Sequence, residues 1–344
     1  MIKKTGLLLL NLGTPDSPDT VSVRRYLRQF LTDPRVIDVP ALLRYLIVYL
    51  AILPFRPARS AHAYQQIWTP QGSPLLVFSE NLRRKVESLL TSTDPSVQVR
   101  LAMRYGNPSV RLAMEAFSRE GIREVVVLPL FPQYAAASSG SAMSHVYEEA
   151  ARLWDPPVLT VLPPFFSSPD YIRMVAARGR VTLEAAPWDH VIFSFHGIPL
   201  RQLKKSESPG ICHQTESCCT STDRSWCYRA ACVQTALALA KDLSLEPSQF
   251  SVGFQSRLGR TEWIRPYLDD LLTDLPARGI RHVVVFSPAF TADCLETLEE
   301  LSIRAEATWK EKGGETLRLV PALNDGDDFA GWIANRFRMV NTPS

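Results

Sequence analysis

A histidine at the end of a strongly apolar run is the first residue in this sequence that could do chemistry. The run His190–Phe195 precedes His196, and the turn sequence Gly197–Pro199 follows it. Val, Ile and Phe favour a buried strand, and Gly-x-Pro predicts that the strand ends in a loop. Ligands of α/β sheets bind beyond the carboxyl ends of the strands, where an imidazole can accept a proton or bind a metal. A structural histidine at a strand end would give the same pattern.

Two glutamates one helical turn apart form the second candidate group. Glu296 and Glu300 share one face of a helix that the pattern predicts over Asp293–Lys310. Such a carboxylate pair can accept protons or guide a cation. Asp293 followed three residues later by Glu296 also fits a capping box, and from the spacing alone helix capping is the preferred interpretation of Glu296.

A cysteine cluster is the third candidate. Five of the six cysteines lie within 21 residues, in a Ser- and Thr-rich segment after the His196 strand: Cys212, Cys218, Cys219, Cys227 and Cys232. Clustered thiols in a cysteine-poor intracellular chain argue against structural disulfides. They favour a bound metal, either an iron–sulfur cluster or zinc, with an unmetallated redox loop as a third alternative. Four ligands are needed, and the spare cysteine is expected to be Cys218 or Cys219 because they are adjacent.

Composition sets the class of protein. The chain has 344 residues, 46% of them hydrophobic, which is enough for two domains with large cores. Its 38 basic and 35 acidic residues give a net charge of +3, which does not support nucleic-acid binding. A small-molecule or peripheral membrane protein fits this balance.

Two apolar segments need to be distinguished from membrane or export signals. Met1–Leu10 looks like a signal peptide, but its apolar run is short and no small-residue cleavage site follows. We therefore expect it to be the first buried strand and the protein to be cytoplasmic. Leu46–Phe55 is too short to span a bilayer and is flanked by Arg44, Arg56 and Arg59. It is either an interfacial helix at the lip of a cleft or a core helix.

Apolar β-branched runs alternate with helical patterns along the whole chain. Strands are predicted at Gly6–Leu12, Val97–Met103, Glu124–Leu128, Val158–Leu162, His190–Phe195, Phe250–Gln255, Arg281–Phe286 and Thr316–Val320. Helices are predicted at Val21–Leu31, Pro74–Leu90, Ser109–Arg119, Ser139–Leu153, Asp170–Leu183, Cys227–Leu243, Ile264–Leu275, Asp293–Lys310 and Phe329–Arg338. Alternating strands and helices indicate βαβ units, and hence an α/β fold with parallel sheets.

The sequence also contains an internal repeat. Gly121–Phe131 recurs as Gly279–Phe290, and Leu12–Pro15 resembles Phe195–Pro199. Both matches keep their order, which predicts two similar α/β domains that face each other across a ligand-binding crevice. In this scheme Leu12 and His196 occupy equivalent positions.

The predicted boundary lies in a Pro- and Ser-rich segment near residues 163–169. The domains are therefore expected at residues 1–165, with the lip of the cleft, and 166–344, with His196, Glu296 and the cysteine loop. The last helix is allowed to pack back on the first domain.

Several motifs, in order along the chain, resemble those of the ferrochelatase family. They are Asn11–Pro15, Met103–Tyr105, Phe131–Tyr134, Ser194–Pro199, Phe254–Gly259 and Ala289–Thr297. The similarity runs from about Lys4 to beyond Leu301. It implies two similar doubly wound, Rossmann-like domains with four-stranded parallel sheets. The implied activity is that of a lyase, which inserts ferrous iron into protoporphyrin IX with release of two protons, the last step of haem biosynthesis.

The resemblance also implies roles for particular residues. His196 and Glu296 match the family's catalytic histidine and glutamate, which take protons and meet the substrate iron. Arg104 would pair with a propionate, since guanidinium suits a carboxylate, and the other implied substrate-binding residues are Leu12, Tyr105, Phe131, Ser138, Ser141, Trp263, Phe290 and Glu300. Ordinary core packing or, for Arg104, a surface ion pair would explain the same residue types.

Cofactor and partners follow from the same resemblance. Some bacterial members hold cysteines in an internal loop like Cys212–Cys232, which implies a [2Fe–2S] cluster on four of the five, with zinc as the alternative. Leu46–Phe55 resembles the family's lip, which touches the membrane. The expected partners are a porphyrin and ferrous iron, no nucleic acid is expected, and the chain would act as a monomer or homodimer.

Two positions depart from the family, and two other functions stay open. Cys294 stands where some relatives carry histidine, and Arg304 where some carry an acidic residue, so the acidic track beyond Glu300 is shorter here. The alternatives are a chelatase for another metal or tetrapyrrole, such as cobalt or coproporphyrin, and a haem- or metal-binding sensor on the same fold. The presence of both His196 and Glu296 favours catalysis over a sensor.

Overall fold

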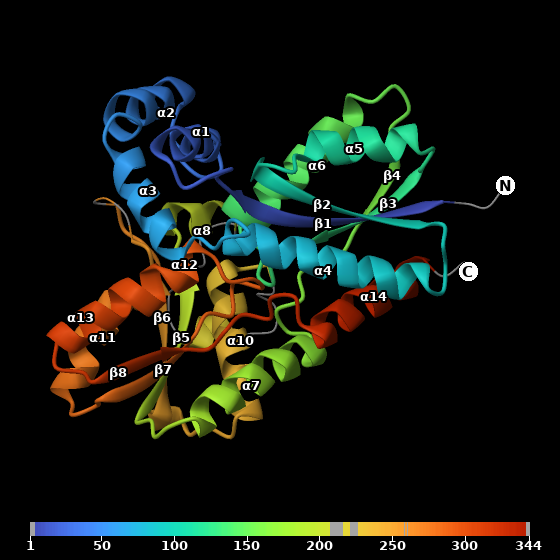
Figure 1. Ribbon diagram of the computed structural model, residues 1–344. Coiled ribbons are helices and arrows are strands. Elements are labelled where there is room, and N and C mark those ends of the chain that lie inside the picture. The colour runs from blue at the N-terminus through green and yellow to red at the C-terminus, as the bar shows by residue number, and fades with distance from the viewer. Residues whose placement is uncertain (1–3, 207–215, 221–225, 258, 260, 342–344) are drawn as a thin grey trace. The chain divides into compact units, whose positions relative to one another are not determined.

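The computed structural model describes residues 4–206, 216–220, 226–257, 259 and 261–341 (Figure 1). The chain divides into two compact units. Unit 1 comprises the residues up to Phe131, Ala135–Pro164 and the segment that begins at Asn324. Unit 2 comprises Pro132–Tyr134 and the described residues of Phe165–Leu323.

Unit 1 is built on a parallel four-stranded sheet with the strand order β2-β1-β3-β4. Its strands are β1 (Thr5–Thr14), β2 (Val97–Gly106), β3 (Glu124–Pro129) and β4 (Val158–Val161). Its helices are α1 (Thr20–Leu31), α2 (Ala41–Leu46), the π-helical η1 (Ile47–Ile52), α3 (Arg56–Ile67), α4 (Pro74–Thr91), α5 (Val110–Arg119), the π-helical η2 (Ala136–Gly140), α6 (Ser141–Ala151) and α14 (Asp327–Asn341).

Helices cover both faces of the unit 1 sheet, which explains why β1 is an unbroken apolar run. Leu7, Leu8, Leu9 and Leu10 are all fully buried, as expected of a central strand of a parallel sheet. Helices α5 and α6 pack on one face, and α4 packs on the other with α14 beside it (Figure 1). The last helix of the chain therefore belongs to the core of unit 1.

Unit 2 repeats this plan with the strand order β6-β5-β7-β8, again all parallel. Its strands are β5 (His190–His196), β6 (Phe250–Gln255), β7 (His282–Phe286) and β8 (Thr316–Leu319). Its helices are α7 (Pro169–Glu184), α8 (Leu200–Ser206), α9 (Glu216–Thr220), α10 (Tyr228–Asp242), the 3₁₀ turn η4 (Pro247–Gln249), α11 (Leu268–Ala277), α12 (Leu295–Leu298), the π-helical η5 (Glu300–Ala305) and α13 (Glu306–Glu311). Helices α11 and α13 pack on one face of this sheet around buried Trp309.

The predicted fold class is confirmed: each unit has a four-stranded parallel sheet within an α/β arrangement. The register also supports the internal repeat. Leu9 pairs with Leu128 in unit 1, and Phe193 pairs with Phe286 in unit 2. Leu9 lies three residues before Leu12, and Phe193 lies three residues before His196. Leu12 and His196 are therefore at equivalent positions near the ends of β1 and β5.

Two predicted helices are wrong in their bounds. The helix expected from Ile264 begins at Leu268, because the residue before a proline disfavours helical backbone and Pro266 lies in this stretch. The helix expected over residues 293–310 is three consecutive pieces, with the π-helical η5 between α12 and α13. Apolar periodicity does not distinguish a π-helical turn from an α-helical one.

The apolar run 46–55 is not a core helix. Seven large apolar side chains of α2, η1 and the turn after η1 are at least 46% exposed: Leu42, Leu43, Tyr45, Leu46, Tyr49, Leu50 and Phe55. Val48 and Leu53 alone anchor this run in the core. Among the described residues, no single helix is long and apolar enough to cross a membrane, although Ala41–Ile52 and Arg56–Ile67, bent by 69°, meet the length and composition criteria together.

Candidate active site

His196 ends β5 with a defined arrangement of its ring. Its Nδ1 lies 2.6 Å from the carbonyl oxygen of Gly197. A carbonyl can only accept, so Nδ1 carries the proton, and Nε2 is left with the lone pair. The main-chain carbonyl of His196 accepts a hydrogen bond of 2.7 Å from the Tyr228 hydroxyl. The half-buried ring is thus held in the tautomer that can accept a proton or bind a metal through Nε2.

Glycine is needed at position 197 because three segments meet there. A Cβ on Gly197 would lie 2.9 Å from the carbonyl oxygen of Gln255 and 3.2 Å from the ring of Trp263. Gly197 N–H donates to that same Gln255 oxygen at 2.9 Å. The segment with Trp263 is held in turn by a 3.1 Å bond from Ile264 N–H to the carbonyl of Ile198. These contacts fix the turn that directly follows His196.

Glu296 lies in the first turn of α12, and it does not cap the helix. The capping box is formed instead by Cys294 and Thr297: Cys294 N–H donates to Thr297 Oγ1 at 3.0 Å, and Thr297 Oγ1 donates to Asp293 Oδ1 at 2.9 Å. The capping interpretation of Glu296 is therefore wrong, because Thr297 occupies the position three residues after the actual N-cap. The Glu296 carboxylate therefore takes no part in this cap.

Cys294 is buried beside this carboxylate. Burial raises the pKa of the Cys294 thiol well above its usual value, and the charge of Glu296 raises it further. The thiol is therefore neutral at physiological pH. This chain therefore places a small protonated group next to Glu296.

Glu300 is held by its neighbours. Its Oε2 accepts a hydrogen bond from the Ser256 hydroxyl and a longer one of 3.5 Å from Gln255 Nε2. Arg304 lies 3.9 Å from Oε1 of Glu300 and is paired more closely with Glu299. Glu300 is therefore oriented from the β6 side and partly neutralised from the next turn of η5.

A second polar cluster, the Asp33 cluster, lies at the carboxyl end of the unit 1 sheet. It consists of Asp33, Arg104, Tyr105 and Ser141. Arg104 Nη2 and the Tyr105 hydroxyl donate to Asp33 Oδ2 at 2.6 and 2.9 Å, the Ser141 hydroxyl donates to the same oxygen, and Arg104 Nε donates to Ser141 Oγ at 2.7 Å.

The electrostatics of the Asp33 cluster are balanced internally. Burial on its own would raise the pKa of Asp33, but the hydrogen bonds from Ser141 and the Arg35 main chain, with the charge of Arg104, hold it below its usual value. Burial and the Asp33 charge raise the pKa of Tyr105. The cluster thus contains an ionised Asp33, a charged Arg104 and a neutral tyrosine.

The structure distributes the other predicted site residues between surface and core. Leu12 is half-buried at the end of β1. Phe131 packs against the unit 1 core, and the Ser138 hydroxyl donates to the Ala135 carbonyl at 3.5 Å. Tyr105 is only 1% exposed, so its hydroxyl serves the Asp33 cluster.

Sequence reasoning missed Asp33, Gln255 and Ser256. No periodicity or motif distinguishes Asp33, which lies two residues after α1 and comes together with Arg104 only in the fold. Gln255 carried a signal that was available: it ends a predicted strand, and His196 drew attention because it directly follows one.

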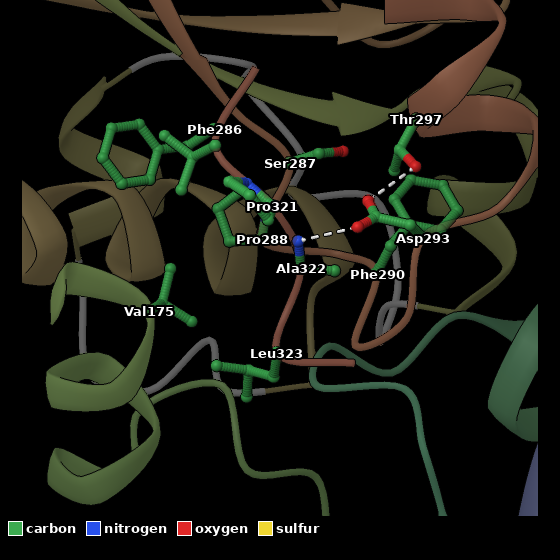
Figure 2. A pocket seen from close by; sticks show the side chains of 11 residues that line it. Val175, Phe286, Ser287, Pro288, Phe290, Asp293, Thr297, Pro321, Ala322 and Leu323 are labelled. Carbon is green, nitrogen blue, oxygen red and sulfur yellow. Dashed lines mark hydrogen bonds between the residues drawn. The ribbon is translucent and has the colours of Figure 1, made fainter. Parts of the chain in front are cut away.

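A small cavity lies beside the start of α12 (Figure 2). It is lined by Phe286, Phe290 and residues 320–323, with Asp293 and Thr297 at one side. Asp293 Oδ2 accepts a 3.3 Å bond from Ala322 N–H there. The cavity has room for about one water molecule, so it is no site for a macrocycle.

The cysteine cluster is described only in part, since Cys212 lies outside the described residues. Cys219, Cys227 and Cys232 are buried, and Arg229 Nη1 donates to Cys219 Sγ at 2.7 Å. Burial raises the pKa of Cys232, and the nearby Cys227 and Cys219 contribute. In the part of the chain that the structure covers, no three His, Cys, Asp or Glu side chains are arranged to hold a metal ion.

Comparison with solved structures identifies the fold. SirB from Bacillus subtilis with Fe3+ superposes with a TM-score of 0.55 at 13% identity, covering 98% of this chain and 96% of that one. The sirohydrochlorin chelatase SirB from Bacillus subtilis subspecies spizizenii in complex with cobalt gives 0.52 at 11% identity, covering 97% and 94%. The fold is thus that of a chelatase with two α/β units.

The sequence comparisons identify the family. The ferrochelatase family model matches residues 4–339, and the chain belongs to the ferrochelatase family. A ferrochelatase of Coxiella burnetii (strain Dugway 5J108-111) is 46% identical over 333 residues, 96% of this chain and 92% of that protein. One from Legionella pneumophila (strain Corby) is 45% identical over 339 residues, 98% and 99% respectively. The resemblance stated from the motifs is confirmed.

Proposed function

We propose that this ferrochelatase, a lyase, inserts Fe²⁺ into protoporphyrin IX through His196 and Glu296. Two pyrrole N–H bonds break and two protons leave the macrocycle, while Fe²⁺ forms bonds to all four ring nitrogens of the resulting dianion, so charge and atoms balance. His196 Nε2 accepts one proton and the Glu296 carboxylate accepts the other. The observation that carries this proposal is the 2.6 Å contact from His196 Nδ1 to the Gly197 carbonyl, which leaves Nε2 able to accept.

The position of Glu296 supports its part in the proposal. The cap of α12 is formed by Cys294 and Thr297. The main-chain carbonyl of Glu296 accepts a hydrogen bond from Gln255, which pairs with His196 in the parallel sheet. Glu300, one turn further, would pass the second proton or guide the cation. The Arg304 charge 3.9 Å from Glu300 limits that track to these two carboxylates.

The decisive assay is anaerobic insertion of Fe²⁺ into protoporphyrin IX, comparing wild type with His196→Ala. We expect the variant to lose about 10²- to 10⁴-fold in kcat, the usual contribution of a positioned acid–base group. His282→Ala is the matched control, because His282 lies at the amino end of the neighbouring strand β7 and contacts Thr316 at 3.1 Å. Equal rates for wild type and His196→Ala would refute the assigned role.

Arg104 is proposed to contact a propionate of the porphyrin. Its Nε and Nη2 serve Ser141 and Asp33, so Nη1 is the group offered to substrate. Leu12, Phe131, Ser138, Trp263 and Phe290 would contact the macrocycle or its edge. Competition between protoporphyrin, with two carboxylates, and coproporphyrin, with four, in one assay tests which porphyrin is the substrate.

We propose that the cysteine loop binds a [2Fe–2S] cluster through four of Cys212, Cys218, Cys219, Cys227 and Cys232. Buried thiols suit iron and the Arg229 cation suits an anionic cluster. Among the described residues, the cysteine sulfur atoms are not arranged to hold a metal ion. No catalytic step is therefore assigned to the cluster. The visible spectrum and the iron and sulfide content of anaerobically purified protein test the proposal. A colourless sample containing zinc would establish the alternative.

We also propose that the exposed apolar side chains of residues 42–55 rest on the membrane, as in a cytoplasmic, peripherally bound monomer or homodimer. The support is the exposure of Leu50 and Phe55, at 68% and 77%. Leu50→Glu and Phe55→Glu should weaken cosedimentation with lipid vesicles severalfold. Leu112→Glu, at an exposed leucine on α5 of the same unit, is the control. Equal cosedimentation of all variants would contradict this part.

A further inference from the structure

The side chain of Gln255 connects the strand that carries His196 to the helix that carries Glu296. Gln255 ends β6 and pairs with His196 in the parallel ladder, so both side chains leave the same face of the sheet. Its Oε1 accepts a 2.7 Å bond from the hydroxyl of Ser194, which lies two residues before His196 on that face. Its Nε2 donates to the main-chain carbonyl of Glu296 at 3.0 Å.

The same amide also reaches the second carboxylate. Gln255 Nε2 lies 3.5 Å from Glu300 Oε2, and the next residue, Ser256, donates its hydroxyl to that oxygen. Ser256 has a φ of 67°, a left-handed conformation that non-glycine residues seldom adopt. Residues 255 and 256 thus hold Glu296 by its backbone and Glu300 by its side chain.

The chemistry of this connection is specific to glutamine. Gln255 is only 4% exposed, and both ends of its amide are used, one as acceptor and one as donor. A glutamate of the same length has no donor for the Glu296 carbonyl, and a methionine has neither function. A buried polar group that loses its partner pays its full desolvation cost, so neither replacement preserves the geometry of α12.

We propose that Gln255 is a positioning residue for iron insertion: its amide holds the Glu296 turn of α12 in place against the carboxyl end of β5. The two proton acceptors then keep a fixed spacing while both pyrrole protons leave. This inference rests on the proposed roles of His196 and Glu296. Gln255 itself touches neither proton nor iron in this arrangement.

The test compares wild type, Gln255→Met, Gln255→Glu and Ser194→Ala in the anaerobic assay, with porphyrin binding followed by fluorescence titration. Gln255→Met should lower kcat about 10- to 100-fold and leave the porphyrin Kd within about twofold. Gln255→Glu should also move the acid limb of the kcat/KM profile to higher pH, because a third carboxylate opposes ionisation of Glu300. Ser194→Ala, which removes one of the bonds, should lose less than Gln255→Met.

Gln249→Met is the matched control, since Gln249 lies just before the other end of β6 and its side-chain oxygen accepts a 2.9 Å bond from the main-chain N–H of Glu246. It should keep the wild-type kcat and pH profile. Wild-type kcat in Gln255→Met and Gln255→Glu would overturn the proposal, even if their melting temperatures fall. If Gln255→Met does not fold, the pH profile of Gln255→Glu and the kcat of Ser194→Ala decide. A wild type that inserts no iron contradicts the proposed function instead.

Discussion

The carboxyl ends of the two sheets are built on one plan and used differently. In unit 1, the end of β1 is apolar at Leu12, and the nearby Asp33 carboxylate has partners from Arg104, Tyr105 and Ser141. In unit 2, the equivalent position is His196, whose Nδ1 contacts the Gly197 carbonyl so that Nε2 keeps its lone pair, and the cap of α12 is formed by Cys294 and Thr297 and not by Glu296. A carboxylate whose hydrogen-bond partners are all protein groups, such as Asp33, stabilises the fold. A carboxylate that is not needed for the cap of its helix, such as Glu296, is available to accept a proton from a substrate.

The test with the largest expected effect replaces the Glu296 carboxylate. Glu296→Gln should lower kcat for iron insertion about 10²- to 10⁴-fold, because the amide cannot accept the pyrrole proton. Its melting temperature should stay close to that of wild type, because Glu296 takes no part in the helix cap. Glu306→Gln is the control, since Glu306 lies on α13 and pairs with Lys310 at 2.7 Å. A melting temperature that falls while kcat persists would place Glu296 with the structural carboxylates.

The counterpart test removes the satisfied carboxylate. Asp33→Ala should cost about 3 kcal/mol of unfolding free energy, because a largely buried Arg104 loses its charge partner, as measured by chemical denaturation. The double variant Asp33→Ala/Arg104→Met should recover part of that loss. Unchanged stability with kcat reduced a thousandfold would reverse the distinction between the two sheet ends.

Glu300 is intermediate between these two cases. Ser256 and Gln255 orient it and Arg304 lies nearby, so Glu300→Gln retains an acceptor for Ser256 and should lose only about tenfold in kcat, near 1.4 kcal/mol. The comparison with Glu296→Gln in the same assay is the measurement. A larger loss than that of Glu296→Gln would make Glu300 the principal proton acceptor.

The smallest expected effect concerns the other end of β5. His190 is buried, and its Nε2 contacts Ser251 Oγ at 2.9 Å. Burial, with the charge of Arg278, lowers the pKa of His190 from 6.5 to about 4. As pH falls from 6.5 to 4, His190 becomes protonated in the unfolded chain but stays neutral in the native state, so the free energy of unfolding decreases across that range.

Replacing His190 tests the direction of this pH dependence of stability. His190→Asn should give a flatter stability curve between pH 6.5 and 4 than wild type in urea denaturation. A steeper curve in the variant would contradict a neutral, buried His190. With His196, the result contrasts two histidines of one strand: the one at the amino end is structural, and the one at the carboxyl end is assigned to catalysis.

Strand positions were predictable because burial on both faces gives continuous apolar runs such as Leu7–Leu10. The equivalence of Leu12 and His196 was also readable, since it depends on local repeats that the register preserves. Partners across the fold were not readable. Asp33 and Arg104 are 71 residues apart in sequence, and no local pattern encodes their contact.

The cap of α12 illustrates the same limit at short range. Asp293 and Glu296 satisfy the spacing rule for a capping box, yet the helix begins one residue later, with Cys294 as N-cap. Asp293 instead binds Thr297 and the main chain of Ala322. A tertiary contact thus overrides the local preference, and spacing alone misassigned Glu296.

The return of α14 to unit 1 has a consequence for biosynthesis. Phe329, Ile333 and Phe337 are buried in α14, Lys85 of α4 donates to the Asp325 carbonyl at 2.6 Å, and Arg338 reaches the Leu89 carbonyl at 2.7 Å. Unit 1, whose strands are translated first, therefore cannot pack α14 against α4 until residues 327–341 have been translated. The core of unit 1 is therefore completed only after the segment of unit 2 that ends at Leu323 has been synthesised.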